Sequence, residues 1–288
     1  RRNRITDAGL ARLKELKDLT KLDISGNQLT DAGLIHVARL TQLRELNLRR
    51  PRGPDGPTPI TDKGLAELRP LKELRSLDLV GTDVTDAGLQ ALASFPQLES
   101  LSLSDLHIGD EGMIHVAGCR NLRALSLLYT LVGDAGLARL ADLKELRQLS
   151  LSSRFVTDAG IAAIKTLPRL EHLELRASRL TDKALGHVAA IKSLTSLELF
   201  GSGEPGVQLG DLFTHAGLAR LKDLAQLRVL SLVNLKITAA GVVALCEMRQ
   251  LSHLDFLMSD ITEEQATQIR QSLPKAHVGV VTGGKYVP

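Results

Sequence analysis

Apolar residues recur at fixed places along nearly the whole chain, with two different periods inside each recurrence. Leu10, Leu13 and Leu16 lie three residues apart, which approximates one face of a helix, whereas Leu22 and Ile24 alternate with polar residues as in a strand. The same pattern returns in a later segment at Leu89, Leu92, Phe95, Leu98, Leu101, Leu103 and Ile108. The pattern therefore predicts a repeated unit made of one short helix and one strand.

These repeats follow one another with a nearly constant period. Eleven of them begin at Thr6, Thr30, Thr61, Thr85, Gly109, Gly133, Thr157, Thr181, Thr214, Thr238 and Thr262. Eight of the ten steps are 24 residues long, and the other two carry insertions of 7 and 9 residues. Such a period indicates stacked repeats, in which each repeat contacts only its neighbours.

Each repeat opens with residues that are typical of a helix start, so each repeat is expected to begin with a capped helix. Nine repeats begin with Thr, whose hydroxyl can accept a hydrogen bond from a free backbone N–H, and in most of them an Asp follows, which suits the positive end of a helix. A Gly stands three residues after the start in nine repeats, although Gly costs a helix about 1 kcal/mol relative to Ala. We attribute this Gly to a close backbone approach between stacked repeats. Ala184 and Gln265 replace it, and Thr262 with Gln265 predicts a capping box.

The strand portion of each repeat carries the spacing LxxLxL, as at Leu19, Leu22 and Ile24, and the sequence TDAGL or a close variant follows it. With these motifs the chain resembles a bacterial leucine-rich repeat protein with 24-residue TDAGL-type, ribonuclease-inhibitor-like repeats, from Ile5 to about Val281. The resemblance implies an α/β leucine-rich repeat solenoid, or horseshoe, of about eleven repeats. In that fold a parallel β-sheet forms the concave face and short α-helices form the convex face. The Asn that often follows the strand is present at Asn27 but replaced in other repeats, so a continuous asparagine ladder is not expected.

We expect residues 1–288 to form a single leucine-rich repeat domain. The two insertions, at about 50–59 and 201–213, both follow strands and are expected on the same rim. Insertions on one face of a repeat array often mark its binding side, although rim loops also vary without any function. The last segment, about 262–288, is expected to cap the core with a strand from Ala276 to Val281.

Composition excludes several classes of function. The chain has 36 Lys and Arg against 33 Asp and Glu, which gives a formal net charge of only +3. So small a net charge falls short of the basic face that binding to nucleic-acid phosphates needs. Aromatic residues make up only 2% and Trp is absent, which argues against stacking surfaces for sugars or single-stranded nucleic acid. No run of about 18 apolar residues is present, so no membrane span is expected. Cys119 and Cys246 lie five repeats apart, too far for a disulfide.

No catalytic, cofactor-binding or metal site is expected. His36, His115 and His187 share one helix position, but they lie three repeats, or about 15 Å, apart and cannot share a metal ion. The GxGxxG pattern at 201–206 lacks a helix at its last glycine, because the next helix begins eight residues later. The stretch 279–285 resembles a phosphate-binding loop, but Tyr286 stands where Ser or Thr is needed and no helix can follow. We therefore expect no enzymatic activity in this chain.

Outward-pointing strand residues on the concave sheet form the expected binding surface. In the middle repeats these residues are small and rich in Ser, which crowding on a tightly curved face explains as well as binding does. Larger side chains flank them, and aromatic and Arg side chains are the usual anchors of interfaces. The candidates for partner binding are Arg49, Arg52, Tyr129, His172, Glu174, Arg176, Phe200, Val233 and Leu257.

The resemblance implies a non-enzymatic protein-binding or scaffold module, because members of this family mostly bind proteins through the concave sheet and its rim loops. The alternative is a substrate-targeting domain of a larger enzyme, ubiquitin-ligase-like or kinase, whose catalytic part lies outside this chain. Nucleic-acid binding through the arginines at positions 1, 2, 4, 49, 50 and 52 is disfavoured because Asp23, Glu45 and Asp78 lie beside them. We expect a protein partner and no nucleic acid, membrane or small-molecule cofactor.

Overall fold

The computed structural model describes residues 5–50, 60–176, 179–201, 213–282 and 285–287. The chain divides into two compact units, Arg1–Leu146 and Arg147–Pro288, which are called here the N-terminal unit and the C-terminal unit. In each unit, strands and helices alternate along the chain, as the apolar pattern predicts. No helix in the described ranges combines the length and the apolar character needed to cross a membrane.

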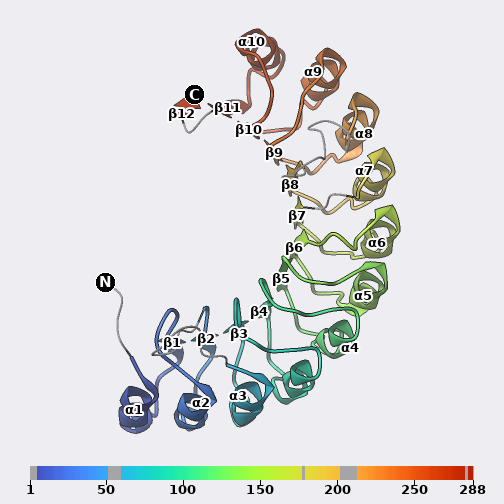
Figure 1. The fold of residues 1–288 in the computed structure, drawn as a ribbon. Helices are drawn as coiled ribbons and strands as arrows, with labels where there is room; N and C mark the ends of the chain where they lie inside the picture. Colours follow the sequence, from blue (N-terminus) through green and yellow to red (C-terminus); the bar gives the residue numbers. More distant parts are fainter. Residues whose placement is uncertain (1–4, 51–59, 177–178, 202–212, 283–284, 288) are drawn as a thin grey trace. The chain divides into compact units, whose positions relative to one another are not determined.

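The N-terminal unit consists of short strands that alternate with α- or 3₁₀-helices. Its strands are β1 (Lys21–Asp23), β2 (Glu45–Asn47), β3 (Ser76–Asp78), β4 (Ser100–Ser102) and β5 (Ala124–Leu128). Its helices are α1 (Asp7–Leu10), η1 (Ala11–Glu15), α2 (Asp31–Val37), α3 (Asp62–Glu67), η2 (Gly88–Ser94), α4 (Gly112–Val116), α5 (Asp134–Arg139) and η3 (Leu140–Asp142). The strands lie side by side in one layer and the helices form a second layer behind them (Figure 1).

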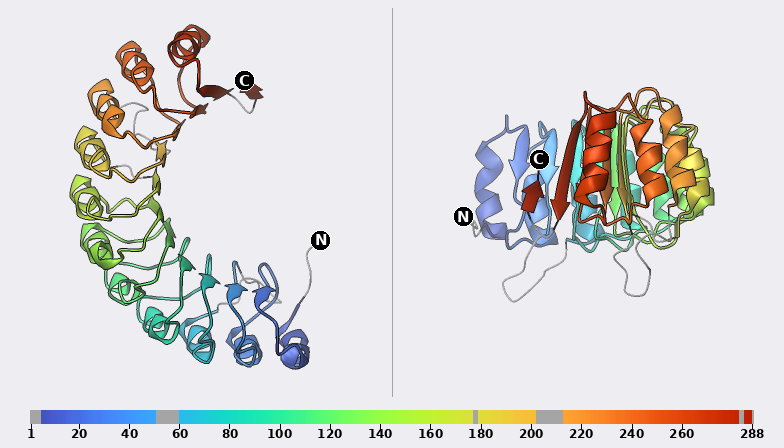
Figure 2. Two further views of the ribbon diagram at one scale, coloured as in Figure 1. Left: turned by 180° about the vertical axis from the view of Figure 1, so that it is seen from behind. Right: turned by 90° about the horizontal axis from the view of Figure 1, so that it is seen from above.

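The C-terminal unit repeats this arrangement with longer strands. Its strands are β6 (Gln148–Ser152), β7 (His172–Arg176), β8 (Ser196–Phe200), β9 (Val229–Val233), β10 (His253–Leu257), β11 (His277–Thr282) and β12 (Lys285–Val287). Its helices are α6 (Asp158–Ile164), α7 (Asp182–Val188), α8 (His215–Arg220), η4 (Leu221–Asp223), α9 (Ala239–Cys246) and α10 (Glu263–Ser272). Here too the strands form one layer and the helices another (Figure 2).

Equivalent repeat positions meet in the sheet of each unit. The strands β1 to β5 pair in parallel, and their central leucines align as Leu22, Leu46, Leu77, Leu101 and Leu125. In the C-terminal unit β6 to β11 pair in parallel in the same way. The constant repeat length produces this register, because after each repeat the chain reaches the equivalent position on the neighbouring strand.

A continuous apolar core lies between the strands and the helices of each unit. The two inward residues of a strand are buried, as Leu149 and Leu151 show with exposed fractions of 1% and 0%. Helix residues such as Leu137 and Ile161 are fully buried from the other side. The other face of each sheet, which no helix of the described residues covers, is called the open face below (Figure 1). The predicted leucine-rich repeat architecture is thus confirmed.

The Asp that follows the first residue of a repeat joins neighbouring repeats. The carboxylate of Asp7 accepts hydrogen bonds from the backbone nitrogen of Thr30 at 3.0 Å and from its hydroxyl at 2.6 Å. Equivalent pairs of bonds join Asp31 to Thr61, Asp62 to Thr85, Asp158 to Thr181 and Asp182 to Thr214. Where Gly replaces Thr, Asp86 and Asp110 still bind the backbone nitrogens of Gly109 and Gly133. These contacts are called the Asp ladder here. The Asp was expected from the sequence to interact with the positive end of its own helix, and the structure shows that it also binds the next repeat.

The recurrent Gly makes room for the Asp ladder. A Cβ atom at Gly64 would lie 2.2 Å from Oδ1 of Asp31, and the same distance separates Gly217 from Asp182. At Gly241 the nearest atom is 3.5 Å away, because His215 stands where the preceding repeat would carry the Asp. Stacked repeats do come close at this Gly, but the expectation of a backbone approach is wrong, because the group that approaches is the side-chain carboxylate of an Asp. Ala184 shows that one repeat accommodates a methyl group there, since Asp158 keeps both bonds to Thr181.

Threonine caps are present in most repeats but not in all. The hydroxyls of Thr30, Thr61, Thr157, Thr181 and Thr214 each accept a hydrogen bond from the backbone nitrogen two residues later. The capping box of Thr262 and Gln265 is confirmed. The prediction that each repeat begins with a capped helix is wrong for Thr6, which makes no cap bond, and for the repeat of Thr85, whose helix η2 is 3₁₀ and uncapped. The hydroxyl of Thr85 is instead bound to Asp62. The prediction is also wrong for α4 and α5, whose N-cap residues Glu111 and Gly133 make no side-chain cap bond.

The described C-terminal end of the sheet contains one more strand than predicted. The expected strand at 276–281 is present as β11, and its inward residues Val278 and Val280 are 4% and 5% exposed. After β11 the chain returns as β12, which pairs antiparallel with it from Val280 to Thr282. The strand β12 was not expected from the sequence, because its residues follow no repeat pattern.

Candidate functional site

The open face of the C-terminal unit presents three rows of side chains, one row for each outward position of the strands. The register of β7 to β11 aligns the first row as His172, Ser196, Val229, His253 and His277. The middle row is Glu174, Glu198, Ser231, Asp255 and Gly279, and the third row is Arg176, Phe200, Val233, Leu257 and Val281. The face therefore carries acidic side chains along its middle and apolar side chains along one edge.

Arg176 is held between two neighbours on this face. Its guanidinium carbon lies 3.4 Å from the centre of the Phe200 ring, a cation–π contact between adjacent strands. Its Nε atom donates a hydrogen bond to Oε1 of Glu174 at 2.6 Å. The side chain of Arg176 is nevertheless 32% exposed. These contacts fix a charged planar group in one orientation on the surface, as an interface anchor requires.

Glu198 lies beside this cluster without a counterion of its own. Partial burial and the nearby charge of Glu174 raise the pKa of Glu198, and Arg176 opposes this shift only in part. Neither the side chain of Glu198 nor that of Asp255 takes part in a hydrogen bond or ion pair within the described part of the chain. Only the small Ser231 separates them in the middle row. The middle row thus holds two ionisable carboxylates that the protein leaves unpaired.

The third row is apolar from Phe200 onward. Phe200, Leu257 and Val281 are half-buried, whereas Val233 between two of them is only 3% exposed. Met258, just beyond the end of β10, is 64% exposed. Val233 therefore offers little area to a partner itself and mainly supports Phe200 and Leu257 on either side. Contiguous apolar surface of this kind is typical of interaction sites.

Two histidines of the first row contact each other at the β10–β11 pair. The rings of His253 and His277 lie 6.0 Å apart between centroids and are tilted by 51°. Nδ1 of His253 is 3.0 Å from the hydroxyl of Ser252. No group of three or more His, Cys, Asp or Glu within the described ranges is arranged to hold a metal ion.

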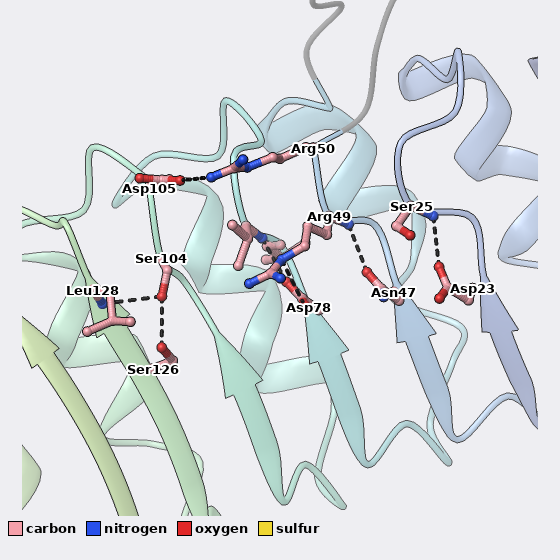
Figure 3. A network of polar contacts seen from close by, with 12 residues as sticks. Asp23, Ser25, Asn47, Arg49, Arg50, Asp78, Ser104, Asp105, Ser126 and Leu128 are labelled. Atoms are coloured by element: carbon pink, nitrogen blue, oxygen red, sulfur yellow. Dashed lines mark hydrogen bonds and ion pairs between the residues drawn. The ribbon is translucent and has the colours of Figure 1, made fainter. Parts of the chain in front are cut away.

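The open face of the N-terminal unit is polar, and its charged groups are partnered within the fold (Figure 3). Lys21 forms an ion pair with Glu45 at 2.7 Å, and Arg49 with Asp78 at 3.7 Å. The carboxylate of Asp23 accepts a hydrogen bond from the backbone nitrogen of Ser25, and hydrogen bonding to Ser25 lowers the pKa of Asp23. The charges of Glu45 and Asp78 are thus balanced by cations of this face, and the carboxylate of Asp23 is stabilised by hydrogen bonding.

One position of the repeat, in the turn that follows the strand, adopts a left-handed backbone conformation in several repeats. Gly26 and Gly81 have positive φ angles, and so do Arg50, Asp105, Tyr129, Asn234 and Met258. This turn leaves Tyr129 61% exposed, and it lets Arg50 reach past Gly81 to form an ion pair with Asp105 at 2.7 Å (Figure 3). Three repeats carry Gly at this position of the sequence, Gly26, Gly81 and Gly201, but bulky residues in the other repeats obscured the signal.

The structure brings several of the predicted site residues together and separates others. Glu174, Arg176, Phe200, Val233 and Leu257 lie next to one another in register, and His172 lies on the same strand as Glu174. Arg49 and Tyr129 belong to the N-terminal unit, and Arg52, like most of the two insertions, lies outside the described residues. The prediction omitted Glu198 and Asp255, although both occupy the same repeat position as Glu174.

Comparisons with known proteins agree with the observed fold. The family profile described as "FBD-associated F-box protein At5g56370, LRR repeats" matches residues 32–216, and a profile described as "Leucine Rich repeat" matches residues 16–38. No curated protein sequence matches the chain.

Two bacterial structures are similar in fold. One is the LRR protein LIC12759 of Leptospira interrogans, with a TM-score of 0.65, 22% identity and coverage of 93% of this chain and 62% of that one. The other is the internalin InlF of Listeria monocytogenes, with a TM-score of 0.56, 20% identity and coverage of 98% and 72%. The chain thus spans less than two thirds of the Leptospira protein.

Proposed function

Because the chain belongs to the leucine-rich repeat family, we propose that it is a protein-binding module without catalytic activity of its own. The binding surface in this proposal is the open face of the sheet together with its rim. The observation that carries the proposal is Arg176, which is fixed between Glu174 and Phe200 on the open face of the C-terminal unit. A side chain held in place before binding loses little conformational entropy when a partner docks.

The proposal includes a place within the family. The constant step of 24 residues and the TDAGL motif support a TDAGL-type, ribonuclease-inhibitor-like subclass of bacterial character. The Asp ladder supports it as well, since it gives the Asp and the Gly of that motif a joint structural reason. We further propose that residues 1–288 act as one continuous repeat domain with a protein partner, and with no nucleic acid, membrane or small-molecule cofactor.

The predicted contact residues follow from the same geometry. Arg176 and Phe200 would form the centre of the contact, with Glu174, His172 and Leu257 around them, and Val233 would support this group from below. Arg49 and Tyr129 would be contact residues of the N-terminal unit itself, and Arg52 would contribute from the first insertion.

Affinity capture from the native source, followed by mass spectrometry, tests the proposal. The Arg176→Ala/Phe200→Ala variant should lose the captured partner while its free energy of unfolding falls by no more than about 1 kcal/mol. The matched control is Arg220→Ala/Val243→Ala, which also removes one cation and one exposed apolar side chain, but from the helical layer. Capture that survives the first change and is lost in the control would contradict the proposal.

A further inference from the structure

The carboxylates of the two open faces differ in how they are neutralised. In the N-terminal unit, Glu45 and Asp78 each form an ion pair with a cation on a neighbouring repeat, Lys21 and Arg49 respectively. In the C-terminal unit, Glu198 and Asp255 have no such partner within the described residues. Among the described residues of that open face, Glu174 is the carboxylate that does form an ion pair, with Arg176. The open face of the C-terminal unit therefore has an uncompensated negative charge along its middle row.

This acidic row runs parallel to the apolar row. Residues two apart on a strand are separated by about 7 Å, so Glu198 lies that far from Phe200, and Asp255 that far from Leu257. Both rows run across the strands, and successive strands are about 4.8 Å apart. One turn of an α-helix advances about 5.4 Å, which is close to this spacing. A helix laid across the strands would therefore present about one side chain per turn to each strand.

Charge decides which helix fits. An apolar partner would cover Glu198 and Asp255 without supplying a counterion, and desolvating unpaired carboxylates is unfavourable. An acidic partner would be repelled by both groups. A basic side chain above Ser231 would lie between the two carboxylates, each one strand away. Its neighbouring apolar side chains would then meet Phe200, Leu257 and Val281.

From these observations we infer that the open face of the C-terminal unit binds a cationic amphipathic helix of a protein partner. Lys or Arg side chains of that helix lie against Glu198 and Asp255, and its apolar side chains lie along the row from Phe200 to Val281. This inference rests on the proposed function and adds the chemistry of the partner to it.

Two synthetic helical peptides test the inference by fluorescence anisotropy at low ionic strength. Both carry Leu along one stripe, and the adjacent stripe carries Lys in one peptide and Glu in the other. The Lys peptide should bind the full chain, with an affinity that falls as salt is added, and the Glu peptide should not bind. Absence of binding by the Lys peptide, or equal binding of both peptides, would overturn the inference.

Substitutions then locate the contact. The Glu198→Gln/Asp255→Asn variant should bind the Lys peptide about tenfold more weakly, because both carboxylates lose their charge while the side-chain shape is kept. Glu45→Gln is the matched control on the other open face and should leave binding unchanged. Unchanged affinity in the double variant would overturn the inference. The proposed function would still stand if the native partner is captured through Arg176 and Phe200.

Discussion

Asp31 and Thr61 are joined across two consecutive repeats by a pair of hydrogen bonds. The backbone nitrogen of Thr61 donates to Oδ1 at 2.8 Å and its hydroxyl donates to Oδ2 at 2.6 Å. The same hydroxyl accepts a hydrogen bond from the backbone nitrogen of Lys63 at 3.2 Å. Thr61 therefore caps its own helix and binds the previous repeat at once, so that helix formation and repeat stacking support each other.

Removing this carboxylate should destabilise the stack. We expect Asp31→Ala to lower the free energy of unfolding by about 1–3 kcal/mol, because the change removes two hydrogen bonds to a charged acceptor. Urea denaturation followed by circular dichroism measures the effect. Asp18→Ala serves as the control, since Asp18 is exposed and accepts no hydrogen bond among the described residues. A loss of equal size in the control would show that the Asp ladder contributes nothing.

Substitution by Ala should change the stability of the protein in opposite directions at Gly64 and at Gly241. Gly64 lies against the carboxylate of Asp31, whereas Gly241 has no Asp beside it. Gly64→Ala places a Cβ 2.2 Å from Oδ1 of Asp31, and the resulting displacement should destabilise the protein by about 1–2 kcal/mol. Gly241→Ala meets nothing closer than 3.5 Å and should stabilise the helix by up to about 1 kcal/mol. Thermal unfolding of both variants measures the difference. Equal signs would refute the explanation given for the glycines.

Glu198 should make the folded state less stable at neutral pH than at acid pH. Its pKa is raised in the folded state by burial and by Glu174, so its contribution to stability is complete below the ordinary pKa of glutamic acid, roughly 4.3, and is lost as pH rises through the raised value. Glu198→Gln should therefore increase stability at pH 7, by about 0.5 kcal/mol or less as for other surface changes. The gain should shrink towards pH 4.

Denaturation of the wild type and of this variant at both pH values provides the measurement. Glu67→Gln, an exposed helix position in the N-terminal unit, controls for the loss of one negative charge. A Glu198→Gln variant that is less stable than the wild type at pH 7 would contradict the expected sign.

Cys119 should be unreactive in the folded protein. Burial raises the pKa of its thiol to about 11, and its side chain is only 8% exposed. At pH 8 about one thiol in a thousand would be ionised, and the thiolate is the form that reacts with alkylating reagents. Mass spectrometry after iodoacetamide treatment should find Cys246, which is half-buried, modified well before Cys119. Both should react at similar rates in denaturant, and similar rates in the native protein would count against the burial argument.

The amino-acid sequence alone determined the architecture. A step of 24 residues places Leu22, Leu46 and their equivalents at one position of successive strands, and the spacing of Leu10, Leu13 and Leu16 assigns the connecting segment to a helix. Apolar periodicity is a local property of the chain, and repetition multiplies its signal, so this much can be read without coordinates. The outward positions follow from the same alternation.

Only the tertiary structure decided how polar side chains meet between repeats. Asp31 and Thr61 are 30 residues apart, and the orientation that joins them depends on the distance and rotation between stacked repeats, which a period does not contain. The contact of Arg176 with Phe200 depends likewise on the register of β7 and β8. The sequence therefore specified which residues face outward, whereas packing in three dimensions determined which of them are paired and which carboxylates remain free.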